Sequence, residues 1–315
     1  MKKVSFFSRY AAKLAMMGLL AGLFVACKDD EVVAPMTVTD IVLENNDFTI
    51  LRAAVQHAGL ADALKTGTLT VFAPNDAAFV ASGYANAAAI TALPAATVKA
   101  ILEYHVLGST VLSTDIATAA NQAVPTLNGQ TAYITKNAAG VSVNGASVVT
   151  ADISADNGVI HVINRLLLPP SQTLLQVAQG NTNFTYLVAA AVRAAQANPT
   201  IVAALTSDAS AFTVFAPTNQ AFIAAGFPTA ASLTAADPAV LAGIILYHVV
   251  PGRIFSTNLT TGNVTTAASG VLKVDVSSGV KITGNGNGTN AANVVSANIL
   301  ATNGVVHAID RVLLP

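Results

Sequence analysis

The chain has 315 residues, with 15 basic and 16 acidic side chains, so its formal net charge is −1. Hydrophobic residues make up 53% of it, but aromatic residues only 6%, and tryptophan is absent, so alanine and valine supply much of the apolar content. Only 10% of the residues are charged, which predicts a nearly neutral surface that is poorly suited to polyanions. The single cysteine excludes a disulfide scaffold and a cysteine-based metal site.

The first 26 residues have the pattern of an export signal. Basic residues up to Lys13 precede an uncharged apolar run over 14–26, which is too short to span a bilayer. The run ends in Leu-Phe-Val-Ala before Cys27, which resembles the lipobox of bacterial lipoproteins. That resemblance implies a signal peptide at 1–26 and lipidation of Cys27, with Phe24 at a position usually held by leucine. An ordinary secretory signal with an incidental cysteine is the alternative.

A tether over 27–36 begins with the acidic segment Lys28-Asp-Asp-Glu. This segment resembles the export tag that sends some lipoproteins to the exposed face of the bacterial outer membrane; a solvated linker is the alternative. Without the leader's four basic residues, 11 basic and 16 acidic residues remain, a net charge of about −5. This balance argues against nucleic acid and against anionic lipid as partners.

A ten-residue phrase occurs twice in the chain. Residues 70–79 read Thr-Val-Phe-Ala-Pro-Asn-Asp-Ala-Ala-Phe, and residues 213–222 read Thr-Val-Phe-Ala-Pro-Thr-Asn-Gln-Ala-Phe. Two further phrases repeat in the same order: Tyr-His-Val at 104–106 and 247–249, and Asn-Gly-Val-(Ile/Val)-His at 157–161 and 303–307. A period of this length is that of a whole domain rather than of a solenoid unit.

The repeat therefore predicts two modules, copy 1 at 37–170 and copy 2 at 171–315. The boundary falls at Pro169-Pro170-Ser171, where two prolines interrupt any helix or strand ladder. We expect each copy to fold independently.

In chain order, copy 1 begins with a helix for which Asp47 is the expected N-cap, with its counterpart at Asn183. The alternating run over 68–72 predicts a strand that Pro74 ends. Asn75 or Asp76 then caps a short helix, and another helix follows Pro94.

In copy 2 the matching helix starts more clearly, because Asp237 precedes Pro238 at the first helical position. The last third of each copy alternates Thr, Val and Ile between Asn-Gly pairs, which is typical of hairpins. These pairs are Asn128-Gly129, Asn144-Gly145, Asn157-Gly158 and Asn303-Gly304. The pattern predicts an α+β module built around a β-sandwich or wedge.

These phrases resemble the fasciclin domain, twice over. The family's first block matches 70–79 and 213–222, its Tyr-His block matches 104–105 and 247–248, and its closing block matches 304–315 in full. In copy 1 the closing block has Asn164 and Leu166 where copy 2 has Asp310 and Val312. The resemblance implies about seven strands with several helices per module, a surface location, and binding to extracellular protein or polysaccharide. It implies no reaction and no fixed ligand.

The residues most open to a binding role are the two Tyr-His pairs, Tyr104-His105 and Tyr247-His248. On an extended segment, neighbouring side chains point to opposite faces, so one member of each pair could reach the surface. The alternative is that both members are internal, with the histidine hydrogen-bonded. His161 and His307 lie in apolar strands and are interpreted as core residues.

Nothing in the sequence predicts catalysis, a metal or a cofactor. No two histidines within one copy have metal-ligand spacing, and Gly-x-Ser-x-Gly is absent. We expect a lipid-anchored, non-catalytic adhesion protein on the bacterial outer membrane. The alternative is a surface hydrolase or an accessory polymer-capture subunit that uses histidine-containing sites.

Overall fold

The computed structural model describes residues 36–315. The predicted signal peptide, the predicted lipidation site Cys27 and the acidic segment 28–31 lie outside the described residues. Two copies of one α+β module make up the described part, so the predicted fold class is confirmed.

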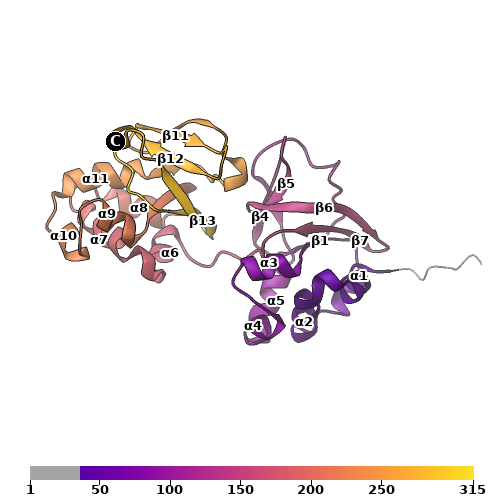
Figure 1. Ribbon diagram of the computed structural model, residues 1–315. Coiled ribbons are helices and arrows are strands. Elements are labelled where there is room, and N and C mark those ends of the chain that lie inside the picture. Colours follow the sequence, from indigo (N-terminus) through magenta and orange to yellow (C-terminus); the bar gives the residue numbers. More distant parts are fainter. Residues whose placement is uncertain (1–35) are drawn as a thin grey trace, which may run out of the picture. The chain divides into compact units, whose positions relative to one another are not determined.

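Copy 1 places its helices first and its hairpins last. Its elements are α1 (Val38–Glu44), η1 (Asn46–Phe48), α2 (Thr49–His57), η2 (Ala63–Lys65), β1 (Leu69–Pro74), α3 (Asp76–Ala81), α4 (Ala87–Thr91), α5 (Ala95–Tyr104), β2 (Val106–Leu107), β3 (Gln122–Pro125), β4 (Thr131–Asn137), β5 (Gly140–Val143), β6 (Ala146–Ala155) and β7 (Gly158–Ile163). Figure 1 shows α2 to α5 gathered on one side of the sheet.

Copy 2 repeats this order with local differences. Its elements are α6 (Leu174–Gly180), η3 (Thr182–Phe184), α7 (Thr185–Ala194), α8 (Thr200–Thr206), β8 (Phe212–Pro217), α9 (Asn219–Ala224), α10 (Ala230–Thr234), α11 (Pro238–Tyr247), β9 (Val249–Pro251), η4 (Ser256–Asn258), β10 (Gly262–Thr265), β11 (Val271–Asp275), β12 (Lys281–Gly284), η5 (Asn285–Asn287), β13 (Ala292–Ala301) and β14 (Gly304–Ile309). Helix α8 stands where copy 1 has η2, and two further 3₁₀ helices, η4 and η5, are present.

Each copy forms one seven-stranded sheet. The order is β2-β1-β7-β6-β5-β4-β3 in copy 1 and β10-β11-β12-β13-β14-β8-β9 in copy 2. The hairpin strands pair antiparallel, as the Asn-Gly pairs predict, but the first and last long strands pair parallel, β1 with β7 and β8 with β14. The repeated phrase at the start of each copy is therefore hydrogen-bonded to the closing phrase.

The turn between β6 and β7 brings two backbones unusually close. A Cβ atom on Gly158 would lie 1.9 Å from the carbonyl oxygen of Leu69, and one on Gly304 would lie 2.1 Å from that of Phe212. Only glycine fits at such a distance. The Asn-Gly pairs at 157–158 and 303–304 are thus needed for the parallel contact as well as for the turn.

The predicted cap at Asp47 is wrong. The side chain of Asn45 accepts from the amide of Asp47, and a 3₁₀ turn precedes α2. The cap of α2 itself comes from Asp76, whose Oδ1 accepts from the Ile50 amide at 2.8 Å. In copy 2, Asn219 accepts from the Tyr186 amide at 3.0 Å. Asn75 in turn caps α3. Positions 75 and 76 of the repeated phrase therefore both act as helix caps.

Each copy has two apolar clusters whose buried members all lie within that copy. In copy 1, one lies among the helices and includes Phe48 and Phe79, and the other lies against the hairpins and includes Phe72 and Ile134. Copy 2 repeats both clusters. Burying each such phenylalanine contributes about 1.5–3 kcal/mol, so each copy has apolar interior enough to be a domain.

Candidate functional site

The histidine of each Tyr-His pair is buried at the end of a helix. His105 ends α5, and its Nδ1 lies 2.8 Å from the carbonyl oxygen of Ile101. Its Nε2 accepts from the Leu167 amide at 2.9 Å, so the proton is on Nδ1, which donates to the carbonyl. His248 does the same with Ile244 and Leu313, at 2.8 and 2.9 Å.

Both rings are held neutral. Burial lowers the pKa of His105 and of His248 to about 4, although the hydrogen bond to the helix carbonyl acts in the opposite direction. Each ring joins the last turn of a helix to the Leu-Leu-Pro segment that closes its copy. This contact explains why each copy contains both the Tyr-His phrase and the closing phrase.

The tyrosine of each pair is also buried and hydrogen-bonded. The Tyr104 hydroxyl donates to the Thr131 carbonyl at 2.9 Å and accepts from Nδ2 of Asn144 at 2.9 Å. Burial raises the pKa of Tyr104 to about 12. The Tyr247 hydroxyl donates to the Val271 carbonyl at 2.6 Å and accepts from the Asn285 amide at 3.0 Å.

The expectation that one member of each pair reaches the surface is wrong. Exposed fractions are 0% for Tyr104 and Tyr247, 2% for His105 and 1% for His248. The alternation of faces belongs to strands, but here the tyrosine is the last residue of a helix and the histidine is its cap. A binding role for the four residues stays a prediction, and in the folded modules none of them presents a surface to a partner.

The second pair of histidines lies in the last strand of each copy. Nε2 of His161 lies 2.9 Å from the Val111 carbonyl, and its Nδ1 accepts from the Asp152 amide at 3.2 Å. The ring stacks on Phe72, with 5.7 Å between centroids. His307 repeats these contacts, and burial lowers its pKa to about 4. The interpretation of both as hydrogen-bonded core residues is confirmed.

One constellation has the residue types of a hydrolase. The Ser113 hydroxyl donates to the Asp152 carboxylate, whose other oxygen lies 3.9 Å from Nδ1 of His161. A catalytic histidine must accept the serine proton, but both nitrogens of His161 already bond to the backbone, and Ser113 bonds to the carboxylate. Burial raises the pKa of Asp152, but the hydrogen bonds from Ser113 outweigh that effect and leave it lowered.

Copy 2 has the same arrangement without the acid. Asn298 replaces Asp152 and bonds to the amide and hydroxyl of Ser256, at 2.7 and 2.8 Å. Asp152 and Asn298 both have a positive φ, 60° and 63°, in a strand that bulges at this point. The shared contact therefore holds a loop against the bulge, whichever side chain is present.

In residues 36–315, no group of three or more His, Cys, Asp or Glu side chains could hold a metal ion. Among the helices of the same residues, none is both long enough and apolar enough to cross a membrane.

Two residues have structural roles that the sequence did not predict. Asn157, interpreted only as a turn residue, accepts from the Val38 amide at 2.9 Å and donates to the Leu64 carbonyl at 2.9 Å, which ties the start of α1 to the sheet. Arg253 bonds to three backbone carbonyls. Its one signal in sequence is a basic residue five positions after a Tyr-His pair in a chain with few charges.

The model of the Fasciclin domain matches residues 46–169 and 182–315. Protein sll1483 of Synechocystis is 40% identical over 156 residues, which is 49% of this chain and 79% of that protein. The transforming growth factor-beta-induced protein ig-h3 of Sus scrofa is 38% identical over 138 residues, 43% of this chain and 20% of that protein.

Human periostin is 30% identical over 175 residues, which cover 56% of this chain and 20% of that protein. The chain thus spans about a fifth of the length of these two animal relatives. Among solved structures, the FAS1 domain pair of the insect cell adhesion molecule fasciclin I is 18% identical, with a TM-score of 0.41 over 88% of this chain and 96% of that one.

Proposed function

Because the chain belongs to the fasciclin-domain family, we propose that it is a non-catalytic adhesion protein that binds an extracellular protein or polysaccharide. Fasciclin domains are typical of cell-adhesion proteins, which supports a binding role. The observation that carries the proposal is that the buried polar groups form hydrogen bonds inside the modules. Both tyrosines and all four repeated histidines are bonded within their own copy, so they serve the fold and leave the surfaces of the two modules for binding.

The test is retention on a solid support. Beads that carry the full chain should retain intact cells, an extracellular matrix protein or a polysaccharide. The matched control is the chain with His105→Ala and His248→Ala together, which keeps the same surface charge but loses two buried anchors. No retention by the full chain, or equal retention by the variant when circular dichroism shows it to be unfolded, would reject the adhesion role.

We further propose that the chain is anchored by lipid at Cys27 and exposed on the bacterial outer membrane. The support is the leader pattern and the acidic segment that follows it. More than one acyl chain makes such an anchor stable, whereas one alone binds marginally. Cys27→Ser should move the protein out of the membrane fraction, and its continued lipidation would contradict the anchor.

Exposure at the cell surface has a separate test. Protease added to intact cells should digest the anchored chain, and alanine at all four positions 28–31 should protect it. Unchanged digestion of that variant would reject the export tag and leave the anchor standing.

A further inference from the structure

Arg253 fills a hollow in copy 2 that is lined by backbone carbonyls. Its Nη1 donates to the carbonyls of Ala301 and Gly304 at 3.1 and 2.7 Å, and its Nη2 donates to that of Thr302 at 3.0 Å. These three oxygens surround the turn between β13 and β14. A planar guanidinium suits them because two of its nitrogens can donate in fixed directions at once.

Copy 1 has threonine at the same place. The Thr70 hydroxyl donates to the carbonyl of Ser109, as the Thr213 hydroxyl does to that of Gly252. The next residue along is therefore Thr110 in copy 1 and Arg253 in copy 2. Equivalent contacts match the turns as well, since the Leu69 amide donates to Asn157 and the Phe212 amide to Asn303.

The carbonyls of Ala155, Asp156 and Gly158 thus correspond to the three that hold Arg253. Among residues 36–315, no side chain donates to them. Instead they border an open hollow of about 340 Å³, with Thr110 on its wall. Asp156 is exposed there and adds a carboxylate, where copy 2 has the neutral Thr302.

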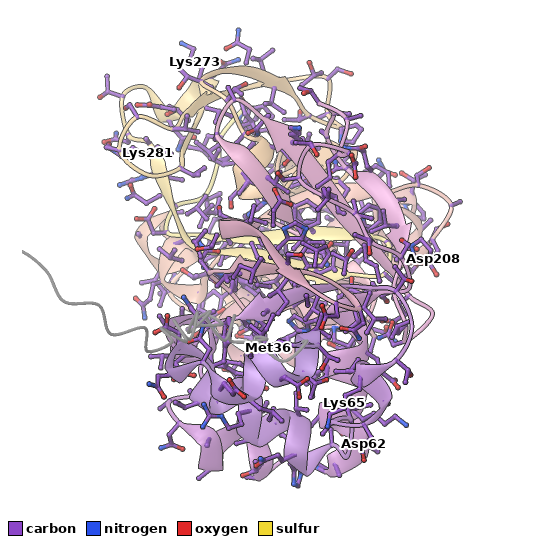
Figure 2. The ribbon with its side chains drawn as sticks, turned by 90° about the vertical axis from the view of Figure 1, so that its right-hand side faces the viewer. Met36, Asp62, Lys65, Asp208, Lys273 and Lys281 are labelled. Atoms are coloured by element: carbon purple, nitrogen blue, oxygen red, sulfur yellow. The ribbon has the colours of Figure 1, made fainter. Side chains whose placement is uncertain are left out.

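One neighbouring charge opposes a cation. Lys65 stands where copy 2 has Asp208, because the Asn157 side chain donates to Leu64 and that of Asn303 to Ser207. The Lys65 ammonium lies 3.8 Å from the Asp62 carboxylate, and Figure 2 shows the two side by side at the helical end of copy 1. Its charge is therefore partly balanced by a neighbour on its own turn.

We propose that the hollow of copy 1 binds the guanidinium group of an arginine side chain presented by a protein partner. Copy 2 shows the same backbone holding this group near the Asp208 carboxylate, and copy 1 offers the three acceptors with the carboxylate of Asp156 instead. The inference deepens the proposed adhesion role, on which it rests for the existence of a partner, and it favours protein over polysaccharide because polysaccharides carry no guanidinium.

The probe is N-acetyl-arginine amide, which presents the side chain without a free carboxylate. Titrated into the full chain, it should shift the amide resonances of Ala155 and Gly158. N-acetyl-citrulline amide has the same shape without the charge and should bind at least about tenfold more weakly. Equal affinity for both compounds, or no shift with either, would overturn the proposal.

Two substitutions exchange the features of the copies. Thr110→Arg should supply an internal guanidinium and weaken binding of the probe at least about tenfold. Arg253→Thr should open the equivalent hollow and add a second site near Gly304. Thr114→Arg, a matched control at an exposed position four residues on, adds the same charge outside the hollow and should leave the affinity within about twofold.

Smaller substitutions keep the test decisive if Thr110→Arg lowers the melting temperature. Asp156→Asn should weaken binding and Lys65→Ala should strengthen it, each by about threefold, because only the local charge changes. The opposite order would reject the site. Probe binding is independent of cell retention, so adhesion without probe binding rejects this inference alone, and probe binding without adhesion rejects the proposed function alone.

Discussion

Copy 1 and copy 2 hold the same backbone groups with side chains of different charge. The Ile50 amide is capped by the carboxylate of Asp76, and the Tyr186 amide by the amide oxygen of Asn219. Asp152 and Asn298 make the same exchange beside the last strand. At these sites the hydrogen bond is kept and the charge is not.

The buried histidines differ from this pattern. His105 and His248 have the same two partners in each copy at the same distances, 2.8 Å to a helix carbonyl and 2.9 Å from a closing-segment amide. A buried polar group must keep both bonds, whereas a group at the surface can exchange one partner for water. The comparison therefore distinguishes two kinds of polar group. Buried groups keep the same partners in both copies, whereas the side chains at surface sites differ in charge between the copies.

The largest expected effect comes from cutting the chain. Fragments 37–170 and 171–315 should each unfold in one cooperative transition, because each contains both of its apolar clusters and a complete sheet. Circular dichroism during thermal unfolding provides the measurement. A fragment without a transition would show that the copies depend on each other for folding.

The next effect is the loss of a buried histidine. His105→Ala and His248→Ala should each lower the free energy of unfolding by about 2–6 kcal/mol, because each leaves a buried carbonyl and a buried amide without a partner. Urea unfolding measures the loss. His57→Ala is the control, since this ring is exposed and should matter by less than about 1 kcal/mol. Markedly unequal losses at 105 and 248 would contradict their shared role.

Acid should destabilise both copies. Burial lowers the pKa of His105 in copy 1 and of His248 and His307 in copy 2 to about 4. Between the unfolded pKa of about 6.5 and the folded value, the unfolded chain binds protons that the folded chain does not. The stability from each neutral ring is thus complete above pH 6.5 and is lost as the pH falls towards 4.

The slope from each of these three rings reaches about 1.4 kcal/mol per pH unit. Hydrogen exchange of the full chain between pH 7 and 4.5, corrected for intrinsic rates, resolves the two copies by their amides. Unchanged protection of a copy over this pH range would mean that its buried rings do not control its acid stability.

Local signals in the sequence predicted much of this fold. Asn75 and Asp237 cap the helices that follow them, because a cap contacts amides two or three residues away. The capping of α2 by Asp76 joins groups 26 residues apart, and the hollow near Gly158 depends on residue 110. Contacts of this kind arise only when the chain has folded, and no local pattern marks them.

The Tyr-His pairs show the same limit in another way. Their residue types and repetition were evident, but their burial follows from the contacts of the preceding helix with the closing segment.

The smallest effect tests the exchange of charge at the capped helices. Asn219→Asp should raise the free energy of unfolding by about 0.5 kcal/mol, because a carboxylate at the start of α7 interacts favourably with the helix dipole. The substitution loses the bond from Nδ2 to the Thr182 carbonyl at 2.9 Å, but the carboxylate can accept from the Thr185 hydroxyl, as Asp76 does from that of Thr49.

Asp76→Asn should lower the stability by a similar amount. Both differences should shrink in about 1 M salt, where exposed charges are screened, whereas a change due to packing would persist. Thermal unfolding of the two variants and of the double variant at low and high salt provides the measurement. If Asn219→Asp destabilises copy 2 at both salt concentrations, the lost bond to Thr182 outweighs the dipole, and the neutral side chain is the better cap in that copy.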